Sequence, residues 1–191
     1  VRFDDGGLLS SWTRLGAFDV DSLVDAFGNV PWQVLQASFH LLRPTLPAWK
    51  AVRLLDRVDN DAFVDNFLAL ESWGNDNVPF PGECYRRYVQ ELYRGDALIE
   101  GTFRLSGHDV RLEDIRCPTL AVTFEHDNIV PWESSAALLE RIASSDKHRL
   151  HRPGGHVGAM VARSAATGLW KELAAWWTRH DSSTVRASRR A

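Results

Sequence analysis

Two residues of this 191-residue chain, Asp127 and His156, have the types and the spacing that acid–base chemistry requires. Asp127 follows an apolar, β-branched run at residues 119–124, and His156 follows a second strand-like piece, residues 148–151, through a Pro-Gly-Gly turn. An imidazole titrates near neutral pH, so it can take a proton from a nucleophile and return it later. A carboxylate beside the ring would fix its tautomer and stabilise its protonated form. We therefore predict that Asp127 and His156 are catalytic partners.

The order of the two residues, acid before base and each in a loop after a strand, is the order in which α/β-hydrolases present the end of a catalytic triad. The interval between them leaves room for one helix. Glu125 and His126 compete with Asp127 for the same role. His126 would point away from Asp127 if the strand geometry continued that far. Asp127 is therefore the preferred acid.

A nucleophile is the triad member that the sequence lacks. The chain contains no G-x-S-x-G or G-x-C-x-G elbow. Cys117 heads the predicted buried strand and reads as a packed, inert thiol, and Cys84 lies on a predicted helix without glycine neighbours of the required form. Trp73 and Asp76 share a loop that could face the site, with core packing and turn formation as the alternative interpretations.

Helical spacing of apolar residues dominates the part of the chain before these loops. The predicted helices are a short one capped by Asp21 and others at residues 32–42, 48–57, 60–73 and 83–93. Such a block inside an α/β protein usually forms a cap. After this block the spacing of the apolar residues changes. Short strands are expected at 102–105 and 110–112, a buried strand at 119–124, and helices at 131–144 and 165–179.

These patterns predict the α/β class, as a partial α/β-hydrolase fold with an α-helical cap subdomain. Val1-Arg2-Phe3 reads as the end of a buried strand, from which we expect that an earlier part of a larger chain is missing. The predicted domains are residues 1–19 (the end of a core strand and a loop into the cap), 20–100 (the cap), 101–180 (core carrying the acid and the base) and 181–191 (a disordered tail).

Composition excludes several classes of function. A formal charge of −3 predicts no strong attraction to nucleic acid or to an anionic membrane. Two cysteines make neither a disulfide framework nor a zinc site, which suits a reducing, cytoplasmic setting. With no signal peptide and no apolar run near 18 residues, secretion and a membrane span are not expected.

Several longer segments carry a family resemblance. In order, they are VRFDDGGLLSSW, GNVPWQVLQASFHLLRP, FLALESWGND, PGECYRRYVQELY, CPTLAVTFEHDNIVP and PGGHVGAMV. Together they resemble the C-terminal half of the catalytic subunit of a poly(3-hydroxyalkanoate) synthase, class III in particular, over residues 1–178. The Asp turn and GHVG are shared with many hydrolases, whereas the pieces from GNVP to ELY are more specific.

The resemblance implies an acyltransferase that polymerises (R)-3-hydroxyacyl-CoA into polyester and releases CoA. It implies His156 as the base, Asp127 as the acid that also assists the substrate 3-hydroxyl, Trp73 as a cap aromatic that binds substrate, and a nucleophilic Cys on an upstream G-x-C-x-G elbow. No cofactor is implied, since the CoA thioester is a substrate. The implied partners are the growing polyester, a missing N-terminal half, a second synthase subunit and a homodimer, in the cytoplasm or at the surface of a polyester granule.

The sequence departs from the family pattern at Asn128, where a His often follows the Asp, at Gly95-Asp96, and at Arg2. The chain alone is expected to be inactive because the nucleophile is missing. Two alternatives stay open: a fragment of a hydrolase, such as a polyester depolymerase or an esterase, and a non-catalytic truncated homologue that acts as an interaction module.

Overall fold

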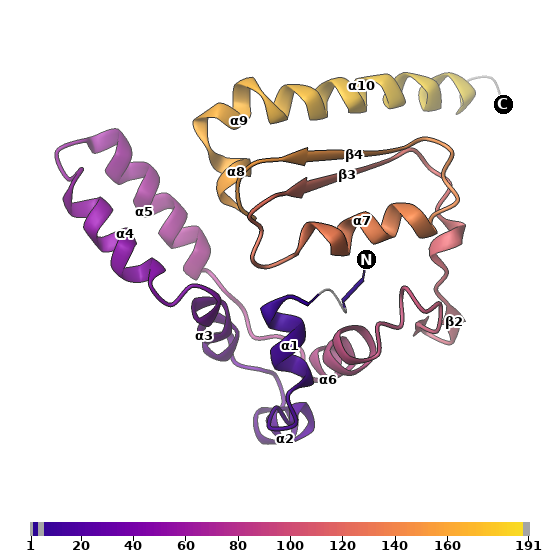
Figure 1. Ribbon diagram of the computed structural model, residues 1–191, viewed down its shortest axis with the longest axis horizontal. Helices are drawn as coiled ribbons and strands as arrows, with labels where there is room; N and C mark the ends of the chain where they lie inside the picture. Colours follow the sequence, from indigo (N-terminus) through magenta and orange to yellow (C-terminus); the bar gives the residue numbers. More distant parts are fainter. Residues whose placement is uncertain (1, 4–5, 189–191) are drawn as a thin grey trace. The chain divides into compact units, whose positions relative to one another are not determined.

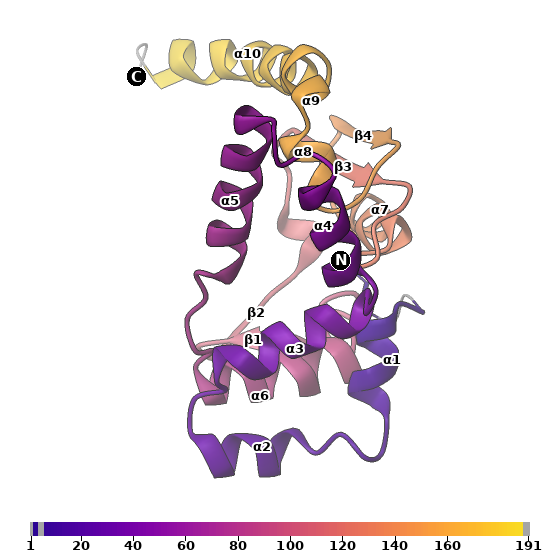
Figure 2. The ribbon, with the colours of Figure 1, turned by 90° about the vertical axis from the view of Figure 1, so that its left-hand side faces the viewer.

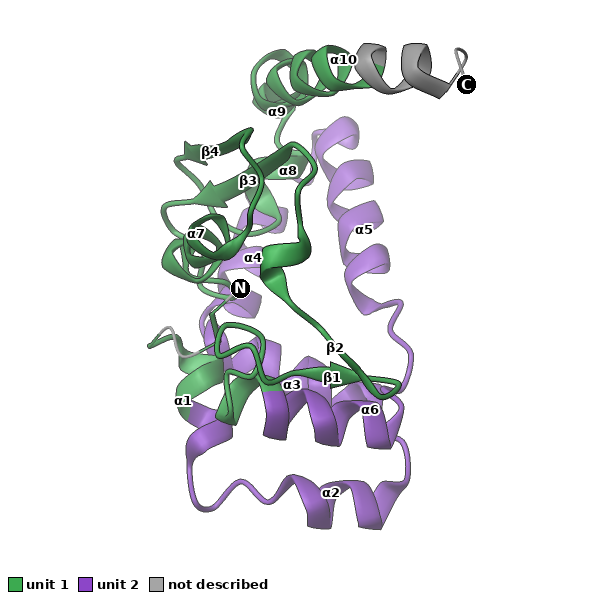
Figure 3. Ribbon diagram, turned by 90° about the vertical axis from the view of Figure 1, so that its right-hand side faces the viewer, with its two compact units in different colours: residues 1–11, 92–191 green, residues 12–91 purple. Residues whose placement is uncertain are grey.

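A computed structural model describes residues 2–3 and 6–188 of the chain, without the side chains of 182–188. The chain forms two compact units, coloured separately in Figure 3. Unit 1 comprises residues 1–11 and 92–191, and unit 2 comprises residues 12–91. The predicted pair, Asp127 and His156, belongs to unit 1 alone.

Two parallel strands, β3 (Thr119–Phe124) and β4 (Lys147–Arg152), form the centre of unit 1. Parallel neighbours need a crossover connection, which here contains helix α7 (Trp132–Arg141). In Figure 1, α7 lies on one side of the two strands and α10 (Leu169–Ser188) on the other. The register runs from Thr119 opposite Lys147 to Phe124 opposite Arg152, so both strands end together and release their loops at the same edge.

Alternation along the strands separates two faces, because successive side chains point to opposite sides of a sheet. Phe124 of β3 is buried together with Leu169 and Leu173 of α10, and other apolar side chains pack against them. Those side chains are Leu120, Val122, Leu150, Ala159 and Met160. Burial of one such large side chain contributes about 1.5–3 kcal/mol, so this cluster fixes α10 against the strands that carry the predicted site.

The remaining elements of unit 1 are short. A two-residue turn, Ser106-Gly107, joins β1 (Arg104–Leu105) to β2 (His108–Asp109). Both turn residues have positive φ, 50° and 82°, as a type I′ hairpin requires. The hairpin confirms the predicted turn, and β1 lies within the strand expected at 102–105. The strand expected at 110–112 was wrong, because β2 ends at Asp109 and a 3₁₀-helix begins at Leu112. The other elements are 3₁₀-helix η2 (Leu112–Asp114), α8 (Gly158–Val161) and α9 (Arg163–Thr167).

Unit 2 is helical within its described residues. Figure 2 shows its helices, of which α2 and α6 lie alongside each other. They are α2 (Val20–Phe27), α3 (Trp32–Leu42), α4 (Leu46–Leu55), α5 (Asp61–Asn75) and α6 (Gly82–Arg87), with α1 (Leu8–Arg14) and the π-helix η1 (Tyr88–Arg94) each shared with unit 1. A core of Val20, Val24, Val30 and Val89 holds α2 to the rest.

Several predicted boundaries differ from the structure. Asp19, not Asp21, caps α2 by accepting from the backbone N–H groups of residues 21 and 22. The predicted helix 83–93 is divided into α6 and a π-helical segment. At the start of the chain, Val1 lies outside the described residues, and Arg2 and Phe3 are not in a strand. Where a disordered tail was expected from 181, α10 continues to Ser188, and 189–191 lie outside the described residues.

Candidate active site

The turn after β3 positions Asp127. The backbone N–H of Glu125 donates to the carbonyl of Arg152 over 3.0 Å, and that of His126 donates to the carbonyl of Gly154 over 2.9 Å. These two bonds extend the β3–β4 ladder by one step beyond the strands. They hold the loop that carries the acid against the loop that carries the base.

The carboxylate of Asp127 is anchored by its own turn. Its Oδ1 atom accepts backbone N–H groups of Ile129 and Val130, both over 2.9 Å. This is an Asx-type turn, in which a short acidic side chain bonds to backbone two and three residues on. The side chain is only 7% exposed. An aspartate at this position could also serve as a turn-forming residue, and the two backbone bonds show that Asp127 does form the turn.

His156 reaches Asp127 because the loop after β4 turns sharply. Gly154 has φ +120°, a conformation that favours glycine, and a Cβ there would lie 2.8 Å from the Cβ of Ala159. A Cβ on Gly155 would lie 3.4 Å from the carbonyl oxygen of His126. The small residues therefore allow the two loops to approach each other.

The two predicted side chains are in contact. Nδ1 of His156 lies 2.8 Å from Oδ2 of Asp127. Because an ionised carboxylate only accepts, Nδ1 carries the proton, and the neutral ring then has an acceptor at Nε2. The imidazole is 44% exposed, and Nε2 has no hydrogen-bond partner among the described residues. The arrangement provides a proton acceptor with its second nitrogen held by a buried carboxylate.

The competing residues take no part in this contact. The bond to His156 comes from Asp127, whereas Glu125 and His126 have exposed side chains on the same turn. His126 contributes only its backbone to the contact between the loops. The preference for Asp127 over these neighbours therefore agrees with the geometry, while the catalytic role of the pair stays a prediction.

Unit 1 offers no cysteine nucleophile close to Asp127 and His156 among its described residues. Cys117 precedes β3, at the opposite end of the strand from Asp127, and six residues at about 3.3 Å each separate the two ends by roughly 20 Å. Cys117 is exposed, so the expectation of a packed thiol was wrong. Between the 3₁₀-helix η2 and β3 the backbone is irregular and bends at Cys117, and residues 116–118 are all exposed. Cys84 is exposed on α6 of unit 2.

Trp73 belongs to unit 2. It lies in the last turn of α5, not in a loop, and Asp76 is the residue that ends this helix. The indole is 65% exposed, so core packing does not explain it. Its predicted role in binding substrate stays a prediction.

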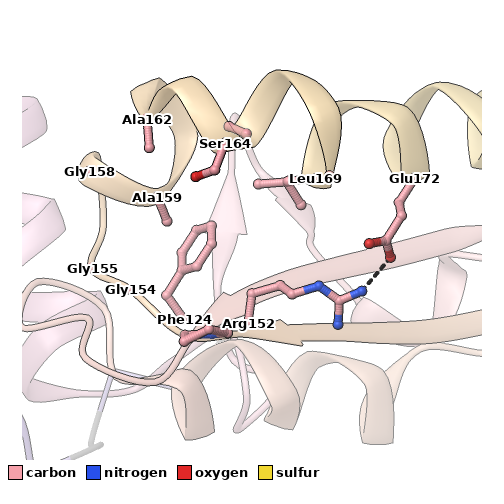
Figure 4. A pocket seen from close by; sticks show the side chains of 13 residues that line it. Phe124, Arg152, Gly154, Gly155, Gly158, Ala159, Ala162, Ser164, Leu169 and Glu172 are labelled. Atoms are coloured by element: carbon pink, nitrogen blue, oxygen red, sulfur yellow. Dashed lines mark hydrogen bonds and ion pairs between the residues drawn. The ribbon is translucent and has the colours of Figure 1, made fainter.

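A hollow of about 400 Å³ lies behind the loop that carries His156. Figure 4 shows Phe124 and Leu169 pointing into it and the ion pair of Arg152 and Glu172 beside it. Hydrogen bonding from Arg152 holds the pKa of Glu172 below its usual value. The backbone of Gly154 and Gly155 lines the hollow. His156 does not line the hollow, although Gly155 beside it does.

Neither a cluster of metal ligands nor a membrane-spanning helix is found in the part of the chain that the structure describes. Across residues 2–3 and 6–188, no three His, Cys, Asp or Glu side chains gather as metal ligands. Over the same residues, no helix combines the length and the apolar character needed to cross a membrane.

Comparison with known proteins identifies relatives, although no family model matches the chain. The poly(3-hydroxyalkanoate) polymerase subunit PhaC of Allochromatium vinosum is 34% identical over 170 residues, which cover 88% of this chain and 47% of that protein. PhaC of Haloarcula marismortui is 31% identical over 180 residues, covering 94% of this chain and 38% of that protein. PhaC of Synechocystis is 31% identical over 162 residues, covering 84% and 43%. The chain thus spans less than half the length of these relatives.

Proposed function

This chain belongs to the poly(3-hydroxyalkanoate) polymerase family, as the counterpart of part of the PhaC subunit, and from that premise we propose that it supplies the general base of a polyester synthase. The complete enzyme would polymerise (R)-3-hydroxyacyl-CoA and release CoA. The observation that carries the proposal is the 2.8 Å contact between Nδ1 of His156 and Oδ2 of Asp127. It lies in the segments that matched the family pattern.

In the proposed first step, Nε2 of His156 takes the proton of a cysteine thiol supplied by a segment outside this sequence. The thiolate attacks the carbonyl carbon of the acyl-CoA thioester, the acyl group moves to the cysteine, and CoA leaves as its thiol with the proton returned by His156. Asp127 stabilises the imidazolium that forms between these events, and its anchored turn keeps the ring from rotating.

In the proposed second step, His156 takes the proton of a substrate 3-hydroxyl. The resulting oxygen attacks the acyl-cysteine, so an ester bond forms as the C–S bond breaks and the thiolate regains its proton. Asp127 would assist through the same hydrogen bond. The proposal needs no cofactor, because the CoA thioester is the substrate. It includes a second synthase subunit and a homodimer as partners, and a location in the cytoplasm or at a granule surface.

A chimera tests the proposal. This chain replaces the matching part of the Allochromatium vinosum PhaC subunit, and two products from (R)-3-hydroxybutyryl-CoA are measured: free CoA by chromatography and insoluble polyester by weight. We expect both products from the chimera and neither from this chain alone. His156→Gln should abolish both. His108→Gln, on the β1–β2 hairpin, is the matched control and should leave both unchanged.

Three outcomes would contradict the proposal. A folded chimera that releases no CoA would remove the assigned activity. An active His156→Gln chimera would remove the assigned base. CoA release without polyester would favour the alternative of a hydrolase fragment over a synthase.

A further inference from the structure

A second cluster of titratable side chains joins α10 to the start of β4, at the other end of the strand from His156. Oδ1 of Asp146 lies 2.9 Å from Nε2 of His148, and Oδ2 lies 2.8 Å from Nε2 of His180. His180 is on α10, whereas Asp146 and His148 belong to the entry of β4. One carboxylate is therefore shared between two imidazoles from different elements.

The surroundings of His180 determine its charge. Nε2 faces the Asp146 carboxylate, and Nδ1 lies 2.7 Å from the backbone carbonyl oxygen of Trp176. Both neighbours only accept hydrogen bonds, and a neutral imidazole has a single N–H group. In a neutral ring, one nitrogen would therefore carry no proton and would still face an acceptor. Only the imidazolium ion donates in both directions.

We propose that His180, Asp146 and His148 form a proton-dependent clamp that fastens helix α10 to the start of β4. The clamp is closed while His180 is an imidazolium ion, and it opens when that ring loses a proton. It does not depend on the proposed synthase activity, because it lies outside the Asp127–His156 site.

Hydrogen bonds hold the backbone of Asp146 at the entry of β4. Its carbonyl oxygen accepts the backbone N–H of Thr119 over 2.9 Å and the hydroxyl of Ser144 over 3.0 Å. Its own N–H donates to the same Ser144 hydroxyl over 3.2 Å. None of these bonds uses the carboxylate, so the carboxylate is free to hold α10 without disturbing the turn. On the other side, the indole of Trp176 stacks on the His180 ring with centroids 4.2 Å apart.

The charges around the clamp agree with this geometry. The hydrogen bond that His180 donates to Asp146 raises the pKa of His180 above 6.5, the Trp176 carbonyl adds to this, and Arg179 opposes it. The hydrogen bond from His180 lowers the pKa of Asp146 below 3.8, and His148 adds to that. From β4, Lys147 directs its ammonium to the carbonyl of Ile142 rather than to the clamp.

These directions fix the pH window. Because the pKa of His180 is raised in the folded chain, its stabilisation is complete below about 6.5 and is lost as pH rises through the raised pKa. Because the pKa of Asp146 is lowered, its stabilisation is present above 3.8 and is lost as pH falls through the lowered pKa. The clamp is therefore closed between the lowered pKa of Asp146 and the raised pKa of His180. It opens when pH rises above the upper value or falls below the lower one.

Nuclear magnetic resonance of the imidazole nitrogens in the full 191-residue chain tests the proposal. We expect both nitrogens of His180 to carry protons below pH 6.5, and the ring to titrate at a higher pH than that value. Asp146→Asn should lower the pKa of His180, because a neutral amide cannot stabilise the cation. His108, on the β1–β2 hairpin, provides the internal reference signal.

Hydrogen exchange gives a second readout that does not need the Asp146 variant to fold. Protection factors of α10 amides around His180, corrected for base-catalysed intrinsic exchange, should fall as pH rises through the titration of His180. His180→Gln should remove that pH dependence, whereas His108→Gln, on the β1–β2 hairpin, should retain it. A singly protonated His180 at pH 6, a pKa unaffected by Asp146→Asn, or equal pH dependence in wild type and His180→Gln would each overturn the proposal.

Discussion

Replacing Asp127 with Asn separates two roles of this residue: it accepts the backbone bonds of its turn, and it accepts the hydrogen bond from His156. The amide oxygen of Asn can still accept the backbone N–H groups of Ile129 and Val130, which now bond to Oδ1 over 2.9 Å. With the oxygen retained there, the amide NH₂ faces Nδ1 of His156. An N–H group opposite Nδ1 requires that nitrogen to accept, so the ring proton moves to Nε2. The turn would survive while the tautomer reverses.

The expected effect on catalysis follows from the tautomer. With its proton on Nε2, the neutral ring of His156 has no lone pair at that nitrogen to receive a proton from a thiol. The equivalent reversal in a serine protease lowers turnover by roughly 10⁴-fold, and a thiol gives up its proton more readily than a hydroxyl. We therefore expect the rate of CoA release by the chimera to fall by roughly 10²- to 10⁴-fold, or about 3–5 kcal/mol in activation free energy.

The expected effect on stability is smaller and differs between two substitutions. Asp127→Asn keeps both backbone bonds of the turn and should change the free energy of unfolding by about 1 kcal/mol or less. Asp127→Ala leaves two N–H groups without their acceptor and should destabilise by about 1–3 kcal/mol for each donor that water does not reach. The alanine variant is therefore the control for damage to the turn.

Two measurements check this reasoning. Nitrogen chemical shifts of His156 in the 191-residue chain report the tautomer directly, without any activity, and urea unfolding reports the stability. The Asn variant should show the proton on Nε2 with near wild-type stability. A proton still on Nδ1, or a chimera whose CoA release is unaffected by Asp127→Asn, would refute the assigned role of the carboxylate.

Two further substitutions, Phe124→Ala and Gly154→Ala, test what positions the site, and Trp177→Ala is the control for the first. Phe124→Ala removes a side chain that is 7% exposed and should destabilise unit 1 by about 3–5 kcal/mol, measured by thermal unfolding. Trp177 is 59% exposed, so Trp177→Ala should change the stability by less than about 1 kcal/mol in the same assay. Gly154→Ala places a methyl group 2.8 Å from the Cβ of Ala159 at a φ of +120°, so it should destabilise by about 1–3 kcal/mol and weaken the His156 Nδ1 proton signal. A Gly154→Ala chain with wild-type stability would contradict the requirement for glycine there.

Local patterns in the sequence were enough to place the strand that leads to the acid. The β-branched run predicts β3 with the bounds that the structure has, Thr119–Phe124, because it is a short apolar stretch between turn residues. The Pro-Gly-Gly turn after the next strand then locates His156. Two parallel strands in register bring their following loops together, which is why two distant residues could be paired from sequence.

Features that depend on tertiary contacts were not predictable in the same way. Cys117 is exposed although it adjoins an apolar strand, since hydrophobic pattern does not reveal what covers a strand entry. The π-helical turns of η1 replace the expected α-helix while Val89 within them is buried, so packing rather than propensity decides that segment. The described residues form a mixed arrangement of helices and strands with one parallel pair, as the α/β class predicts, whereas the α/β-hydrolase fold stays a prediction.

The contacts that orient the acid and the base all come from a short stretch of unit 1. The backbone bonds of Glu125 and His126, the Asx turn of Asp127 and the close approach at Gly154 lie within residues 124–159. None of these contacts involves unit 2 or a segment outside this sequence. It follows that a missing nucleophile would remove the reaction without removing the orientation of His156. The tautomer of His156 should therefore be the same in the 191-residue chain as in the chimera, and a difference between the two would show that the rest of the enzyme, not this stretch, sets the geometry of the pair.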